Sequence, residues 1–282
     1  MTSAASPIQS SPIPLLTAEF WQETFALTRR LFIQLQRRPV TLVVGIVQPL
    51  LWLILFGALF QNAPIFGAGQ NYTQFLGAGV IVFTAFGGAL NAGVPVIFDR
   101  EFGFLNRLLV APLTSRFSIV LASSLFIVSV ALLQTAAIVG ADYVLGGGIP
   151  DVRGLAVVAL IVGLLVLGFT ALSLGLAFAM PGHQQLLAFI FLVNLPLIFS
   201  STALAPFSFM PTWLRWVASL NPLTFAIEPI RHVYRTSTWS FADVVLQAPW
   251  GNLTLAGSLG LLTGFVVVSV LLVQGVLRKG LA

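Results

Sequence analysis

Reactive side chains are few in this sequence, and none of them forms a recognisable catalytic group. The chain has no Cys, and its two histidines, His183 and His232, are isolated, with no second His at metal-ligand spacing. The single lysine, Lys279, follows no Gly-rich segment with the spacing of a phosphate-binding loop. There is no G-x-S-x-G elbow around a nucleophilic serine. We therefore expect no enzyme activity, metal or cofactor in this chain, and any ATP to be hydrolysed by another protein.

Uncharged amides are the main polar groups within the long apolar segments of the chain. They are Gln48, Asn91, Gln134 and Asn194. An unpaired amide in an apolar medium costs on the order of several kcal/mol, so each should face another helix, a subunit interface or a substrate path. Hydrogen bonding between helices is the simpler interpretation, and lining of a path is the functional one. No acidic residue lies in the middle of a confident apolar segment, which disfavours a proton-coupled transporter.

The composition places these residues in a membrane protein. Hydrophobic residues make up 58% of the 282 residues and charged residues only 7%, whereas a soluble domain has roughly a quarter charged residues. The net charge of +5 is spread between the apolar segments, so it forms no continuous basic patch for a nucleic acid. The lipid bilayer is the expected partner.

Six apolar segments are long enough to cross a hydrocarbon core of about 30 Å as helices. They are residues 40–60, 75–98, 117–140, 155–180, 186–204 and 253–277. The alternation of barrel strands is absent, so we expect an all-α polytopic domain over residues 39–282. Two small-residue series, Ala171-Gly175-Ala179 and Ala256-Gly260-Gly264, suit close helix packing or a dimer contact.

The amino-terminal region predicts a tail and an interfacial helix. Residues 1–16 are rich in Ser, Pro and Ala and are expected to be disordered. Residues 17–38 have a polar and an apolar helical face, so they predict an amphipathic helix lying flat on the membrane. The alternative is an amphipathic helix packed on protein. With six spans, nine Lys and Arg residues fall on the amino-terminal side and four on the other, which places both termini in the cytoplasm.

A charged segment after the second span, residues 99–116, combines acidic and basic side chains with apolar ones. Its pattern predicts a short amphipathic cytoplasmic helix that Pro112 stops. Exposed apolar side chains need a partner, and the alternative is a helix that lies on the membrane and only connects two spans. The candidate contact residues are Asp99, Glu101, Phe102, Leu105, Arg107, Leu108 and Leu109.

A second segment, residues 205–249, is too apolar for a solvated loop and too rich in Pro for an ordinary span. It predicts two short re-entrant or interfacial helices, residues 213–220 and 223–234, at the outer side of the membrane. A seventh span is the alternative. The candidate residues are Trp213, Trp216, Asn221, Pro222, Glu228 and Arg231. Glu228 and Arg231 are three apart on a helix and could pair, with a surface pair of no functional role as the alternative.

Both segments carry a resemblance to a known family. The sequence DREFGFLNRLLVAPLTSR (residues 99–116) and the sequence MPTWLRWVASLNPLTFAIEPIR (residues 210–231) resemble the type 2 ATP-binding-cassette exporter permeases, which include daunorubicin-resistance-like exporters. The second segment is similar to the family's Pro-Trp-Leu and Asn-Pro-Leu-Thr signature. The first departs from the common Gly-Thr-Leu-Glu sequence, since it reads Gly103-Phe104-Leu105-Asn106.

The resemblance implies a transport mechanism rather than an enzyme. Two permease chains would associate as a homodimer in the cell membrane, and a separate ATPase subunit would bind ATP and Mg and act on the helix around Glu101–Val110. Uncharged spans favour a hydrophobic or amphiphilic cargo, such as a drug or lipid, moved out of the cytoplasm. The alternatives are export of a polysaccharide or lipid-linked glycan and, in a different class, a passive channel or a membrane scaffold without ATP coupling.

Overall fold

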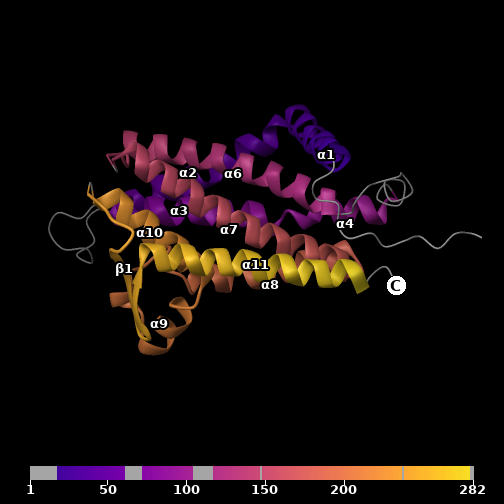
Figure 1. Ribbon diagram of the computed structural model, residues 1–282. Helices are drawn as coiled ribbons and strands as arrows, with labels where there is room; N and C mark the ends of the chain where they lie inside the picture. Colours follow the sequence, from indigo (N-terminus) through magenta and orange to yellow (C-terminus); the bar gives the residue numbers. More distant parts are fainter. Residues whose placement is uncertain (1–17, 61–71, 104–116, 147, 237, 280–282) are drawn as a thin grey trace, which may run out of the picture.

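The computed structural model describes residues 18–60, 72–103, 117–146, 148–236 and 238–279, and most of these residues are helical. The predicted tail, residues 1–16, lies outside the described residues. Figure 1 shows an elongated bundle in which α1, the end of α4 and the carboxyl end of α11 lie at one end. The short elements α9, α10 and β1 gather at the opposite end. We call these the α1 end and the α9 end of the bundle.

Helices make up nearly all of the elements, and their order follows the apolar segments of the sequence. The elements are α1 (Ala18–Arg37), α2 (Pro39–Phe60), α3 (Tyr72–Leu90), α4 (Gly93–Glu101), α6 (Phe117–Val144), α7 (Val152–Ala179), α8 (His183–Phe199), the 3-10 helix η2 (Phe207–Phe209), α9 (Thr212–Ala218), α10 (Pro222–Arg235), β1 (Val244–Ala248), β2 (Gly251–Thr254) and α11 (Leu255–Lys279).

Five stretches of the described chain are long and apolar enough to cross a membrane. They are Pro39–Phe60, Phe75–Glu101, Ser118–Val144, Val152–Ala179 and Leu255–Val276. The apolar helix α8 has only 17 residues and is shorter than the other candidates. A mostly helical, polytopic membrane protein is therefore confirmed. The shorter helix α8 occupies the position of the predicted span over residues 186–204.

The second predicted span is broken into α3 and α4. Pro95 has no N–H to donate to the carbonyl of Asn91 four residues earlier, so the helix cannot continue normally there. The Oγ of Ser173 in α7 lies at the break, where it accepts from the Gly93 N–H at 2.9 Å and donates to the Leu90 carbonyl at 2.6 Å. The interrupted backbone is thus satisfied by protein, as an apolar surrounding requires.

Helix α7 lies at the centre of the bundle and packs closely beside α11. Its Ile161, Val162 and Leu165 are fully buried. A Cβ on Gly168 would lie 2.5 Å from the Phe265 ring, and a Cβ on Gly175 would lie 2.9 Å from the Val273 side chain. Gly168 and Gly175 therefore allow close packing within one chain, and Gly175 belongs to the first small-residue series, whereas Ala179 of that series is exposed.

Helix α1 packs on α6 through one face and leaves another face open. Phe20 and Thr24 are buried, and the rings of Phe32 and Phe126 meet edge to face at 5.1 Å. Trp21 and Phe25 on the neighbouring face are exposed. The packing agrees with the alternative of a helix on protein, while the exposed aromatic face remains available for a lipid surface.

A β-hairpin that the sequence did not predict follows α10. Strands β1 and β2 pair antiparallel, with Ala248 opposite Gly251, and Gly251 has a φ of +145°, which glycine tolerates. The indole N–H of Trp250, in the turn, donates to the carbonyl and the Oγ of Ser219 at 3.3 and 3.1 Å. This contact holds the hairpin against the end of α9.

Candidate functional site

The four amides singled out in the sequence line one cavity. Gln48 from α2, Asn91 from the break between α3 and α4, Gln134 from α6 and Asn194 from α8 all border a cavity of about 420 Å³. We call it the amide cavity. Its other lining residues extend from Leu35 at the α1 end to the middle of α6. The structure thus brings together residues that lie as many as 146 positions apart, from 48 to 194.

The amides differ in what they contact. The Gln134 amide donates to the Gly45 carbonyl of α2 at 3.2 Å, which is the interhelical hydrogen bond expected of a structural residue. The Asn91 amide donates to the Gly87 carbonyl of its own helix at 2.8 Å. The Oδ1 of Asn194 is buried and has no hydrogen-bond partner in the described part of the chain. An unpaired buried acceptor is costly, so Asn194 differs from the other amides, but its Oδ1 is covered and would have to turn to meet a ligand in the cavity.

Two glycines give the amide cavity its room. Gly87 and Gly88 both line it, and a Cβ on either would meet no atom within 4 Å. Neither glycine is therefore required by close packing in a single chain. The lining residues include no charged side chain, so the walls are apolar with a few amides, as in sites for small organic ligands.

At the α1 end, acidic residues of the charged segment join α4 to its neighbours. Asp99 pairs with Arg30 of α1 at 3.3 Å. Glu101 accepts from the backbone N–H of His183 at 2.7 Å and meets its ring Nδ1 at 2.5 Å. Phe102 is exposed, whereas Leu105, Arg107, Leu108 and Leu109 lie outside the described residues.

Arg100 belongs to the same group, although the sequence analysis did not select it. Its guanidinium donates to the carbonyls of Ala177 at 3.1 Å, Phe178 at 3.2 Å and Pro181 at 3.0 Å, and also to that of Met180. These carbonyls lie at the carboxyl end of α7, where helix carbonyls lack partners and a positive charge is favoured. Arg100 therefore fixes the end of α4 against the junction of α7 and α8.

At the α9 end, Asn221 and Pro222 start α10. The Asn221 Oδ1 accepts from the Leu223 N–H at 2.9 Å, and its amide donates to the Leu197 carbonyl at 2.7 Å and the Ser200 Oγ at 3.0 Å. Pro222 follows at the first helical position, where its missing N–H costs nothing. Asn221 thus caps α10 and ties it to the end of α8. Trp213 and Trp216 of α9 remain exposed.

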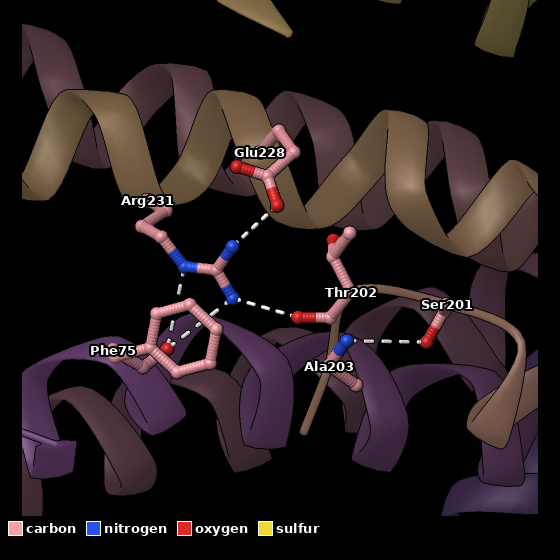
Figure 2. A network of polar contacts seen from close by, with 6 residues as sticks. All are labelled: Phe75, Ser201, Thr202, Ala203, Glu228 and Arg231. Atoms are coloured by element: carbon pink, nitrogen blue, oxygen red, sulfur yellow. Dashed lines mark hydrogen bonds and ion pairs between the residues drawn. The ribbon is translucent and has the colours of Figure 1, made fainter. Parts of the chain in front are cut away.

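Glu228 and Arg231 do pair, and the pair is buried, which disagrees with the alternative of a surface pair. The Arg231 side chain is 5% exposed and the Glu228 side chain 15% exposed. Figure 2 shows the Arg231 guanidinium between Glu228, the Thr202 carbonyl at 2.9 Å and the Phe75 carbonyl at 3.4 Å. It also stacks on the Phe75 ring, 3.7 Å from the ring centroid. Helical spacing showed that the two residues could pair, but not that neighbouring elements would cover them.

The segment after α8 is shaped to reach Arg231. The Ser201 Oγ donates to the Ile198 carbonyl at 2.6 Å and accepts from the Ala203 N–H at 3.2 Å, which turns the Thr202 carbonyl toward the guanidinium (Figure 2). The Ala203 carbonyl would lie 2.4 Å from a Cβ at position 79, so this turn can approach α3 only beside Gly79. The buried cation therefore links α3, α10 and the segment after α8.

Asp142 is a further buried ionisable residue, and no sequence motif had indicated it. The predicted span ended at residue 140, but α6 continues to Val144 and takes Asp142 into the bundle. Asp142 is fully buried, and neither carboxylate oxygen has a hydrogen-bond partner among the described residues. The signal was the continuing apolar sequence on both sides of residue 140.

Comparisons with known proteins agree with this architecture. The ABC-2 type transporter family matches residues 22–235. A relative from Porphyra purpurea, named "Putative transport permease ycf38", is 50% identical over 265 residues, covering 93% of this chain and 91% of the relative. Its counterpart in Cyanophora paradoxa is 51% identical over 262 residues, covering 92% and 90% of the two chains.

A more distant relative comes from Mycobacterium tuberculosis (strain H37Rv). Named "Probable doxorubicin resistance ABC transporter permease protein DrrC", it is 23% identical over 245 residues, which are 82% of this chain and 85% of the relative. With the family match, the apolar helices and the two signature segments, these similarities show that the chain belongs to the ABC-2 type transporter family and is a multi-pass membrane permease.

Proposed function

We propose that the chain is the membrane-spanning subunit of an ATP-driven exporter that moves a hydrophobic or amphiphilic compound out of the cytoplasm. A separate ATPase subunit would bind ATP and Mg and supply the energy. The observation that carries this proposal is the amide cavity, because four helices contribute hydrogen-bonding groups to one uncharged chamber. A chamber of about 420 Å³ matches the roughly 300–1,000 Å³ of small-molecule sites.

The character of the cavity supports an amphiphilic cargo. Apolar walls favour apolar parts of a ligand, while the exposed amides of Gln48 and Asn91 offer hydrogen-bonding groups for a hydroxyl or amine. The distant relative DrrC is named for doxorubicin resistance, and we extend a drug-like cargo to this chain on that basis. A polymeric glycan would need a longer channel than this chamber, so we rank it second.

The α1 end has the connections that coupling to an ATPase requires. Asp99, Arg100 and Glu101 join the end of α4 to α1, to the end of α7 and to the start of α8. We propose that the residues that follow, Leu105 to Leu109, contact the ATPase subunit. A displacement there would then reach α1, α7 and α8 together, because each is bonded to α4. A ligand shifts such an equilibrium only through different affinities for its two states, and ATP would supply that difference in the ATPase.

A second copy of the chain would complete the chamber. Helix α2 lines the cavity and is largely exposed, with Val43, Val47 and Leu51 open at its surface. We propose a homodimer in the cell membrane in which the partner covers this side. We infer from the distribution of Lys and Arg that both termini are cytoplasmic; α1 and the carboxyl end of α11 lie at the same end of the bundle (Figure 1), as this inference requires.

Coexpression with candidate ABC ATPase subunits, and selection of one that co-purifies with this chain, tests the proposal. Leu108→Asp should weaken co-purification of the ATPase, since it would place an unpaired charge in an apolar contact. Glu101→Ala should retain the ATPase but reduce export, because it removes the bonds between α4 and α8. Phe25→Ala, an exposed change on α1, is the control and should alter neither. If Leu108→Asp keeps full ATPase binding and full export, or export continues without ATP, the proposed coupling is wrong and a passive transporter becomes the better explanation.

A further inference from the structure

A second cavity, distinct from the amide cavity, lies at the α9 end of the bundle. Its volume is about 560 Å³, and α10, the segment from η2 to α9, and strand β1 form its walls. The two cavities have no lining residue in common. Three arginines, Arg215, Arg231 and Arg235, line it together with a single carboxylate, that of Glu228. The charged lining therefore carries two positive charges in excess, and we call it the arginine pocket.

Arg231 gives the arginine pocket a fixed wall. Its guanidinium is held by Glu228, the Thr202 carbonyl and the Phe75 carbonyl, and it stacks on the Phe75 ring (Figure 2). Because Glu228 neutralises this buried cation, the excess charge of the pocket comes from Arg215 and Arg235. Burial lowers the pKa of the Arg231 guanidinium, Glu228 opposes that effect, and the charge of Arg235 lowers the pKa further. Arg235 follows Arg231 by four residues on α10, about one helical turn, and both line the same pocket.

Arg215 is directed to the pocket by the backbone before α9. Its Nε donates to the Met210 carbonyl at 2.8 Å and its Nη2 to the Ser208 carbonyl at 3.4 Å. These bonds fix the Arg215 guanidinium beside the backbone before α9, where it lines the pocket while the residue remains exposed. Guanidinium groups suit oxyanions, because their planar N–H groups match two oxygens of a phosphate or carboxylate.

The surroundings of the arginine pocket indicate what carries the oxyanion. On α9, next to the pocket residues Thr212 and Arg215, the side chains of Trp213 and Trp216 are exposed, and Phe209 and Trp250 beside them are exposed as well. Trp residues are enriched where a membrane protein meets the lipid headgroups. A charged cavity next to exposed aromatics fits a ligand with an anionic head and an apolar body.

We propose that the arginine pocket binds the phosphate headgroup of an anionic lipid, with the acyl chains lying along the aromatic face of α9. This proposal does not depend on ATP-driven export. Arg215 and Arg235 supply the binding charges, and Arg231 with Glu228 forms the rigid floor. The lipid would bridge α10, α9 and the hairpin, and so stabilise the packing of elements that one chain leaves partly open.

Lipid titration of the purified full-length protein tests this. The protein is reconstituted in nanodiscs of phosphatidylcholine, and phosphatidylglycerol with the same acyl chains is added while bound lipid is counted by native mass spectrometry. We expect phosphatidylglycerol to bind about tenfold more tightly than phosphatidylcholine. Arg215→Gln combined with Arg235→Gln should abolish that preference, whereas Arg153→Gln, an exposed arginine at the same end on α7, should preserve it. These variants leave Arg231 intact, so the buried network and the fold are retained.

Three results would overturn the proposal. Equal binding of the two lipids would show that the pocket does not select an anionic headgroup. A preference that survives the double variant, or disappears in Arg153→Gln, would place the anion elsewhere. An added arm contains inorganic phosphate without phosphatidylglycerol: if millimolar phosphate protects the protein from thermal unfolding as well as the lipid does, the pocket is a site for a free anion rather than for a lipid.

Discussion

Gly88 offers the most direct way to test whether the amide cavity holds the transported compound. It lines the cavity, and a Cβ there would meet no atom within 4 Å, so a larger side chain fills space without clashing with the chain. The helix itself should not suffer, because replacing a mid-helix glycine by alanine removes a penalty of roughly 1 kcal/mol. Gly88→Ala, Gly88→Val and Gly88→Leu therefore form a series that reduces the volume of the cavity in steps.

The size of the effect follows from the size of the cavity. Leucine adds four carbon atoms to a chamber of about 420 Å³. Crowding of an occupied site by added carbons costs typically about 1–3 kcal/mol, which corresponds to a loss of affinity of roughly 5- to 150-fold. We expect this loss for Gly88→Leu, a smaller one for Gly88→Val, and near-normal behaviour for Gly88→Ala.

Stimulation of ATPase activity in the reconstituted permease–ATPase complex measures the affinity. A panel of hydrophobic and amphiphilic compounds identifies one that stimulates the wild type, and its half-maximal concentration is then compared across the series. Gly140→Leu is the matched control, because Gly140 is an exposed glycine of α6 with open space at its Cβ and it does not line the cavity. If Gly88→Leu leaves the half-maximal concentration unchanged, or Gly140→Leu raises it equally, the amide cavity is not the substrate site.

Three further predictions concern buried and bonded charges. Arg231→Met should lower the free energy of unfolding by about 3–5 kcal/mol, because it leaves Glu228 buried without its partner. Denaturant titration in detergent measures this loss. The double variant Arg231→Met with Glu228→Met should lose less, and an equal or larger loss would contradict the reasoning. Asp142→Asn should keep or raise the free energy of unfolding, since the carboxylate has no hydrogen-bond partner among the described residues. A loss above about 2 kcal/mol would contradict this and show that the Asp142 carboxylate does make a stabilising contact. The Ser240 N–H and then the His232 ring lower the pKa of Asp243, so its stabilisation is complete above the ordinary carboxyl range and is lost as the pH falls through the lowered value. Acidification from about pH 5 to pH 3 should therefore lower the protection of amides against hydrogen exchange, relative to their intrinsic rates at each pH, at the junction of α10 and the hairpin. A loss of protection that persists in Asp243→Asn would have another origin.

The sequence by itself determined the class of the protein and the position of most helices. Long uncharged runs can satisfy their backbone in lipid only as helices, so the apolar segments predicted α2, α6, α7 and α11 closely. At the α9 end, Asn221 and Pro222 start α10 as a capping residue followed by proline should, although this local signal was not used to predict where the helix begins.

Only the tertiary structure decided which residues meet. The amides at positions 48, 91, 134 and 194 line one cavity because α2, the break between α3 and α4, α6 and α8 turn them toward the same space. A hydropathy pattern does not show how one helix is rotated relative to its neighbours, so it could not predict this. Burial of the Glu228–Arg231 pair depends on carbonyls from Phe75 and Thr202, which are remote in sequence. The role of Arg100 could not be predicted, because its partners are backbone carbonyls at the end of α7. Every residue has a backbone carbonyl, so the sequence there does not indicate which ones bind an arginine. Spacing along one helix predicts contacts within that helix, whereas contacts between helices depend on packing that involves the whole chain.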